Sequence, residues 1–307
     1  MKRFILTLAL VATALVAIAE SRTDKLLREL RNPKSDYVFV VSHRADWRNF
    51  PENSLEAIES AIKMGVDMVE LDIHRTADGE LVVCHDRTIN RTTNGKGKIG
   101  ELTLDYIKSR YLRAGHNAVT RYKMPTLAEA LDLCNGRVLI NLDKGINYYD
   151  QVLAMLVERN MVDQVVIKSG KSVATMKEFF SKHKENMLYM PIISYTAKSW
   201  AKHEVMFNEY LSTDLPFIAF EMCWNGTLPG EKKVFKKVVK SGKKLWINTL
   251  WGSLCGGNES GYYDDRAVGN EEKIYGKILS YGTSMIQTDR PQMLINYLES
   301  KGRHTLK

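Results

Sequence analysis

The stretch from Glu70 to Asp86, ELDIHRTADGELVVCHD, combines two acids, a tight-turn sequence and a terminal His-Asp pair. Side chains of a strand alternate between its two faces, so Glu70 and Asp72 are predicted to direct both carboxylates at one point. Ala77-Asp78-Gly79 supplies the positive-φ residue of a tight turn, which would run LVVC back along the first strand and bring His85 towards the acids. An exposed hairpin with ordinary polar side chains is the alternative for this stretch taken alone.

Paired carboxylates suit a hard divalent cation, because carboxylate oxygens are the preferred ligands of Ca²⁺ and Mg²⁺. Asp143, in NLDKG, is the nearest candidate for a third ligand, with Asn141 behind it on the same face. His43 and His85 would flank the cation and supply imidazoles for general acid and base catalysis. Arg44 offers a bidentate fork to a phosphate. This set suits attack at a phosphodiester, where negative charge must be neutralised while protons are exchanged.

Strands have to position these residues, and eight apolar runs alternate with amphipathic helical stretches. The runs are YVFVVS from Tyr37, MVELDI from Met68, RVLINLD from Arg137, QVVIKS from Gln164, MLYMPII from Met187, PFIAFE from Pro216, KLWINT from Lys244 and SMIQTD from Ser284. The alternation predicts an α/β fold, a (β/α)8 TIM barrel with LVVC as an added hairpin arm, and an active site at the carboxyl ends of the strands. Further polar residues stand at those ends: Lys168, Glu221, Asn248 and Asp289.

Residues 87–123 do not fit the repeat, since they are polar, contain glycine and are helical only around Leu104 to Tyr111. With too few apolar residues for a core of its own, this segment is predicted to be a small insertion after the hairpin, over the barrel mouth. It would belong to a single domain of residues 20–307. The polar loop GSLCGGNESGYYDD after the seventh strand is expected on the same side, where both segments could shape a substrate pocket.

The first 19 residues have a basic start, an apolar run and an Ala17-Ile18-Ala19 ending. The run is shorter than the roughly 20 residues of a spanning helix, and this pattern is typical of a signal peptide. We therefore expect an exported chain, periplasmic or secreted, that is soluble after cleavage and has no stable membrane insertion.

Composition narrows the class further. Hydrophobic residues make up 44% and charged residues 26% of the chain, which indicates a globular protein. The formal net charge of +8 is interpreted as scattered apart from short lysine groups, so a solvated helix face is favoured over nucleic-acid binding. The four cysteines are too widely spaced to form a motif. Nothing in the sequence indicates an oligomeric state.

The chain resembles the glycerophosphodiester phosphodiesterases. The matching segments are SHRADW, FPENSLEAIESAIKMGVDMVELDIHRTADGELVVCHDRTINRTTNGKG, MPTLAEAL, KLWINT and IQTDRP, in the order that the family has them. The resemblance implies hydrolysis of a small glycerophosphodiester to sn-glycerol 3-phosphate and an alcohol. It implies one divalent cation, Ca²⁺ or Mg²⁺, held by Glu70 and Asp72, with phosphate contact from Arg44. His43 and His85 would be the acid-base pair.

The chain departs from the family at two places. Ala45 stands where the family usually has glycine, and Asp143-Lys144 replaces an E-x-K pair. Adjacent residues of a regular strand face opposite sides. We therefore expect Asp143 to complete the metal site and Lys168, rather than Lys144, to supply the positive charge near the phosphate, unless a bulge at Gly145 turns both inward.

Four more residues are placed around this centre. Trp246 is predicted to contact the substrate or its phosphate. The second shell of the metal would comprise Glu52, which the resemblance implies, together with Asn141 and Glu221.

Other functions stay open. A cyclising reaction or an intact lipid substrate would use the same barrel, although a lipid needs an apolar rim and the loop after Trp251 is polar. A secreted barrel that only binds a ligand would lack a catalytic histidine or a metal acid, and none is missing unless Asp143 fails as a ligand. A glycosidase needs carboxylates about 5 to 9.5 Å apart across a sugar bond, whereas Glu70 and Asp72 share one strand.

Overall fold

The computed structural model describes residues 20–183, 187–196, 198–226 and 231–306. The predicted signal peptide, residues 1–19, lies outside the described residues. No helix within these ranges combines the length and apolar character that crossing a bilayer requires. All four cysteines are buried and unpaired, in line with their wide spacing.

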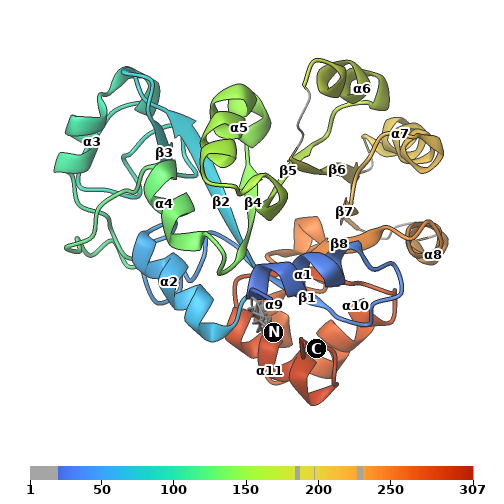
Figure 1. The fold of residues 1–307 in the computed structure, drawn as a ribbon. Coiled ribbons are helices and arrows are strands. Elements are labelled where there is room, and N and C mark those ends of the chain that lie inside the picture. The colour runs from blue at the N-terminus through green and yellow to red at the C-terminus, as the bar shows by residue number, and fades with distance from the viewer. Residues whose placement is uncertain (1–19, 184–186, 197, 227–230, 307) are drawn as a thin grey trace, which may run out of the picture.

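Eight parallel strands close into a barrel, which confirms the predicted (β/α)8 fold (Figure 1). The sheet runs β1-β2-β4-β5-β6-β7-β8-β9, and β9 pairs back with β1. Each of the eight predicted runs contributes one barrel strand: β1 (Phe39–Ser42), β2 (Met68–Arg75), β4 (Leu139–Asp143), β5 (Val165–Ser169), β6 (Leu188–Tyr195), β7 (Ala219–Trp224), β8 (Lys244–Asn248) and β9 (Met285–Thr288). The remaining strand, β3 (Leu81–Val83), pairs antiparallel with β2, which confirms the hairpin.

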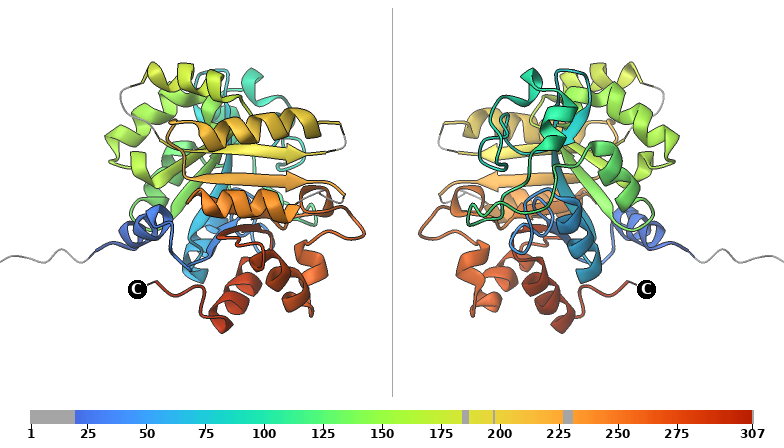
Figure 2. Two further views of the ribbon diagram at one scale, coloured as in Figure 1. Left: turned by 90° about the vertical axis from the view of Figure 1, so that its right-hand side faces the viewer. Right: turned by 90° about the vertical axis from the view of Figure 1, so that its left-hand side faces the viewer.

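Helices surround the barrel (Figure 2). They are α2 (Leu55–Met64), α4 (Leu127–Cys134), α5 (Tyr149–Glu158), α6 (Val173–Ser181), α7 (Trp200–Ser212), α8 (Glu231–Lys240), α9 (Asp264–Ala267), α10 (Lys277–Leu279) and α11 (Pro291–Ser300). Local chemistry sets the bounds of α2, because the Ser54 hydroxyl accepts the amide of Ala57 and Gly65 ends the helix at a φ of 91°. The loop that carries His43 and Arg44 runs from β1 to this helix, so the start of α2 fixes the carboxyl end of the loop.

The barrel interior changes from apolar to polar along the strands. At their amino ends, inward side chains such as Met68 and Met285 pack with Leu26 and Leu30 of α1 (Arg22–Arg31), a helix that the sequence analysis did not predict. Two residues further along, the inward side chains are buried and polar: Glu70, Asn141, Lys168, Glu221, Asn248 and Gln287. The amino end of the barrel is therefore closed by apolar packing, and the polar side chains lie towards its carboxyl end.

Residues 87–123 form the predicted insertion, with one helix, α3 (Leu104–Ser109), and a 3₁₀ turn over Ile99–Glu101. The apolar residues of this segment pack in a core that it shares with the hairpin. Ile89, Ile99, Ile107 and Leu112 are buried in a cluster with hairpin residues such as Val82. The hairpin supplies the apolar surface that the insertion cannot provide alone, in line with the expectation that the segment has no core of its own.

Candidate active site

Three carboxylates meet at the mouth of the barrel. Glu70 and Asp72 come from β2, Asp143 ends β4, and one oxygen of each lies within 4.8 Å of the others. The strand register explains the meeting, since Asp72 pairs with Asp143 and Glu70 with Asn141. The structure thus brings together the three acids that the sequence analysis proposed as metal ligands, and places Asn141 directly beside one of them.

The electrostatics of this trio fit a divalent cation. Burial and the nearby Asp72 raise the pKa of Glu70 well above its usual value, because a third negative charge is costly in a desolvated site. Burial opposes ionisation of Asp72 too, but Lys144 prevails and lowers its pKa. The buried Oδ1 of Asn141 finds no hydrogen-bond donor among the described residues. Carboxylate and amide oxygens are the ligands that Ca²⁺ and Mg²⁺ take.

Lys144 reaches this site, which corrects the expectation that strand alternation turns it away from the mouth and leaves only Asp143 facing the cation. Its Nζ lies 2.7 Å from Asp72 Oδ1 and 3.1 Å from the carbonyl oxygen of His85. Strand β4 ends at Asp143, so the alternation of faces no longer applies, and Lys144 adopts a left-handed φ of 64°. Both residues consequently face the mouth.

Lys168 lies in the polar layer beneath the acids. Its Nζ is 3.3 Å from Glu221 Oε2. Burial opposes its charge, but Glu221, Asp143 and Glu70 together raise its pKa, so the ammonium is retained. Its ion-pair partner among the described residues is therefore a carboxylate of the barrel interior.

Trp246 does not have the predicted role of a substrate contact. Its side chain is completely buried in the apolar layer at the closed end of the barrel. Its Nε1 donates to Asn248 Oδ1 at 2.7 Å, and Asn248 Nδ2 donates to Glu221 Oε1 at 2.7 Å. Trp246 thus orients the partner of Lys168. Trp251 is the aromatic residue at the mouth, 44% exposed and edge-on to His43 with ring centroids 5.9 Å apart.

His43 is held by a buried carboxylate. Its Nδ1 lies 2.8 Å from Asp289 Oδ1, and both side chains are 9% exposed. The Nε1 of Trp47 donates to the same oxygen at 2.6 Å. Because an ionised carboxylate only accepts, Nδ1 of His43 donates, and its Nε2 stays available for proton exchange.

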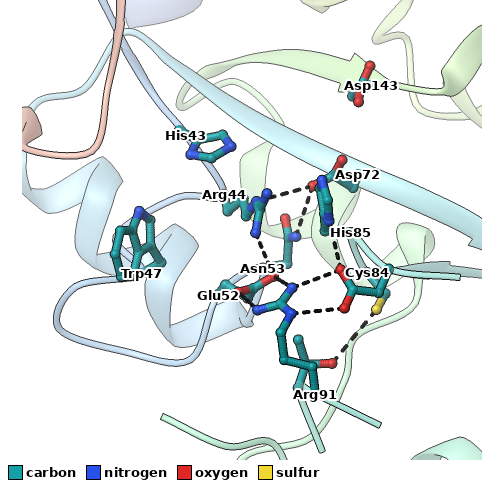
Figure 3. Close-up of polar contacts among 12 residues, drawn as sticks. His43, Arg44, Trp47, Glu52, Asn53, Asp72, Cys84, His85, Arg91 and Asp143 are labelled. Carbon is teal, nitrogen blue, oxygen red and sulfur yellow. Dashed lines mark hydrogen bonds and ion pairs between the residues drawn. The ribbon is translucent and has the colours of Figure 1, made fainter. Parts of the chain in front are cut away.

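His85 is held in the same way by a partly exposed carboxylate. Its Nδ1 lies 2.8 Å from Asp86 Oδ1, with the two side chains 41% and 27% exposed. Arg91 donates to Asp86 and to Glu52 (Figure 3). The hydrogen bond from Arg91 is the largest cause that lowers the pKa of Asp86, so this carboxylate keeps its charge beside the imidazole.

Arg44 connects these parts. Its amide donates to Glu70 Oε2 at 3.1 Å, and its guanidinium donates to Glu52 at 3.2 Å (Figure 3). Its buried Nε has no hydrogen-bond acceptor among the described residues and lies 3.8 Å from Asp72 Oδ2, so it can donate to a bound anion. Arg44 and Ala45 both have left-handed φ angles, 51° and 60°, which explains why glycine is expected at the second position.

The sequence analysis gave no role to Asp86, Arg91 and Asp289. Asp289 was recognised only as a polar residue at a strand end, and its partner His43 lies on the neighbouring strand across the closure of the barrel. Asp86 directly follows His85, so that dipeptide was the available signal. Arg91 had no signal, because its two acidic partners come together only through the fold.

Comparisons with known proteins agree with this geometry. A model of the glycerophosphoryl diester phosphodiesterase family matches residues 43–211, and a model described as a domain of unknown function matches residues 189–298. A glycerophosphodiester phosphodiesterase of Caldanaerobacter subterraneus is 35% identical over 162 residues, 49% of this chain and 66% of the relative. Human glycerophosphodiester phosphodiesterase 1 is 41% identical over 102 residues, 32% of this chain and 31% of the relative. The chain thus spans between 31% and 66% of the length of these relatives.

Solved structures share the fold over most of their length. A glycerophosphoryl diester phosphodiesterase of Parabacteroides distasonis has a TM-score of 0.70 at 21% identity, covering 91% of this chain and 92% of that one. A phosphodiesterase of Oleispira antarctica, in complex with the product sn-glycerol-3-phosphate, has a TM-score of 0.62 at 19% identity, covering 86% and 97%. At these identities the likeness shows the barrel.

Proposed function

Because the chain belongs to the glycerophosphoryl diester phosphodiesterase family, we propose that it hydrolyses glycerophosphodiesters to sn-glycerol 3-phosphate and an alcohol, with one divalent cation, Ca²⁺ or Mg²⁺. One observation carries the proposal: three converging carboxylates lie at the same barrel mouth as two histidines, each hydrogen-bonded to a carboxylate through Nδ1. The named product in the Oleispira structure supports the choice of substrate.

Glu70, Asp72 and Asp143 would hold the cation, which supplies positive charge to neutralise the phosphoryl oxygens. Arg44 and Lys144 lie beside this trio, and they would bind the remaining phosphate oxygens. The Nε2 atoms of His43 and His85 would exchange protons, one taking a proton from the attacking oxygen and the other giving one to the departing alcohol.

The other candidate functions receive less support. A barrel that only binds its ligand would lack part of this machinery, but every proposed catalytic histidine and metal acid is present at the mouth. A glycosidase would leave both histidine–carboxylate pairs without a task. No observation favours a cyclising reaction or an intact lipid substrate over hydrolysis.

We also propose that the chain is exported, to the periplasm or the medium. The pattern of residues 1–19 supports this, with its basic start, apolar run and small residues at the end. Cleavage after residue 19 in a secreting host, found by amino-terminal sequencing of the purified protein, would agree with it. An intact amino terminus on protein recovered from the cytosol would contradict it.

The proposed activity can be tested with purified protein and a panel of glycerophosphodiesters that differ in the alcohol. Formation of sn-glycerol 3-phosphate should stop after exhaustive chelation and return when Mg²⁺ or Ca²⁺ is added. Asp143→Asn should require a higher cation concentration, because one ligand loses its charge. Full turnover after chelation would contradict the metal role, and no turnover of any diester with either cation would contradict the function.

A further inference from the structure

Positive charge is concentrated in the insertion. Residues 87–123 contain nine lysines and arginines against two acids, a net charge of +7 in a chain whose formal net charge is +8. The interpretation of a scattered surplus is therefore wrong for this segment. Three of the nine cations form ion pairs. The other six have no ion-pair partner among the described residues: Arg87, Lys96, Arg110, Arg113, Arg121 and Lys123.

Several of these cations lie against tyrosine rings. Lys123 Nζ is 3.4 Å from the centroid of the Tyr111 ring, and the guanidinium of Arg110 is 4.4 Å from that of Tyr106. The hydroxyl of Tyr106 donates to the carbonyl oxygen of Lys96 at 3.5 Å. With Arg121, which lies against Tyr122, these residues form a surface that we call the insertion patch: Lys96, Tyr106, Arg110, Tyr111, Arg121 and Lys123.

Apolar groups are exposed on the same segment. Tyr111 is 41% exposed, and Val119 is 51% exposed beside the turn formed by residues 114–118. The backbone of Val119 forms a β-bridge with that of Arg113 across this turn, so the exposed valine lies opposite one of the cations. Tyrosine and an aliphatic side chain among lysines and arginines match the boundary between phospholipid headgroups and acyl chains.

We infer that the insertion patch binds the surface of an anionic phospholipid bilayer, independently of turnover. Unpaired cations are attracted to anionic headgroups, and Tyr111 and Val119 have apolar surface to bury there. A nucleic acid or another soluble polyanion would use the cations but would gain nothing from the exposed valine. The insertion follows directly after His85 and Asp86 in the chain, which links the bound surface to the loop that carries one of the two histidines.

The chain contains its own control surface. Residues 231–244, which include α8, hold seven lysines against one glutamate, and Lys236, Lys237 and Lys240 are exposed. Among the described residues of α8, Val239 is exposed but the aromatic residue, Phe235, is buried, so the exposed tyrosine of the insertion has no counterpart there. The two views of Figure 2 face opposite sides of the barrel, with α8 in front on the left and the insertion in front on the right. Charge alone would make α8 a comparable binding surface.

The test is co-sedimentation with two kinds of vesicle. One contains only phosphatidylcholine, and the other is made anionic with about 30% phosphatidylglycerol. Wild type should bind the anionic vesicles, and added salt should release it. Lys96→Glu/Arg121→Glu/Lys123→Glu should lower the partition coefficient at least roughly 100-fold. The matched variant Lys236→Glu/Lys237→Glu/Lys240→Glu should bind within about threefold of wild type.

Three outcomes would overturn the inference: no binding to anionic vesicles, equal loss in the two triple variants, or unchanged binding by Tyr111→Ser/Val119→Ser together with equally tight binding to polyphosphate. The last outcome would indicate a polyanion instead of a bilayer. Turnover of a soluble glycerophosphodiester reports that each variant is folded. If the glutamate variant does not fold, the corresponding triple glutamine variant removes the charges and should lose binding in the same direction.

Discussion

His43 and His85 are both bonded to a carboxylate at 2.8 Å through Nδ1, but their surroundings differ. Asp289, which holds His43, is buried, accepts from Trp47 and belongs to the barrel frame. Asp86, which holds His85, is partly exposed and is fixed by ion pairs with Arg91 at the start of the insertion. The first pair is positioned by packing and by a hydrogen bond from an uncharged donor, Trp47, and the second by ion pairs at the surface. Water screens the second more than the first, so equal distances do not imply equal contributions.

Removal of either imidazole should have the largest effect. His43→Ala and His85→Ala are each expected to lower kcat by about 10² to 10⁴ on a glycerophosphodiester, the usual loss of a general acid or base. Steady-state kinetics on protein shown by circular dichroism to be folded would check this. A variant that keeps near wild-type turnover would show that its histidine is structural.

Removal of the carboxylate charge should lower kcat to different extents in the two histidine–carboxylate pairs. Asp289→Asn keeps an oxygen that can accept from His43 but loses the charge that stabilises the imidazolium, so we expect roughly a 10- to 100-fold loss in kcat. Asp86→Asn should cost less, because solvent already screens its charge. Trp47→Phe is the control that removes one hydrogen bond from Asp289 without changing its charge. A larger loss in Asp86→Asn than in Asp289→Asn would contradict the ranking.

A smaller effect on stability should come from Asp264, which supports the buried pair. Its Oδ2 accepts from the amide of Asp289 at 2.7 Å, and its Oδ1 accepts from Thr249 and Tyr275. Burial raises its pKa from 3.8 to about 6. The folded protein therefore holds an extra proton between these pH values, so ionised Asp264 destabilises it above pH 6, and this cost disappears as the pH falls towards 4.

The rise in pKa corresponds to about 3 kcal/mol, at about 1.4 kcal/mol for each pH unit. The free energy of unfolding of wild type, measured with urea relative to Asp264→Asn, should increase by up to that amount from pH 8 to pH 4. Asp86→Asn is the control of opposite sign, since the pKa of Asp86 is lowered and its contribution is lost as the pH falls. A difference between wild type and Asp264→Asn that does not change with pH would contradict the account.

Strand periodicity was sufficient to predict the barrel and the meeting of three acids at its mouth. Glu70 and Asp72 share a face by alternation, and Asp143 occupies the same height on the next barrel strand in the sequence. Each of these relations is local, or follows from one parallel pairing. The predicted role of Trp246 failed for a related reason. Alternation correctly predicted that its side chain faces the barrel interior, but not how far along the barrel axis it lies. Trp246 belongs to the apolar layer at the closed end, and Asn248, two residues later on β8, belongs to the polar layer.

The remaining features depend on geometry that periodicity does not encode. Lys144 enters the site through a left-handed φ immediately after the strand, where alternation no longer holds. The pairing of His43 with Asp289 requires the barrel to close between β1 and β9. Helix α1 packs against the barrel interior through only two fully buried leucines, Leu26 and Leu30, a pattern too short to be recognised beside the predicted signal peptide.

The central claim is that the two histidines divide proton transfer at one cation site. It is tested most directly by comparing kcat/KM of His43→Ala and His85→Ala on a glycerophosphodiester and on a diester whose leaving group is p-nitrophenol. An acidic phenol departs without a proton. With that substrate, removing the general acid should therefore lower kcat/KM only slightly, whereas removing the general base should lower it as much as before. The account predicts that one variant recovers to within about tenfold of wild type while the other stays at least about 10²-fold lower. Recovery of both variants, or of neither, would contradict it.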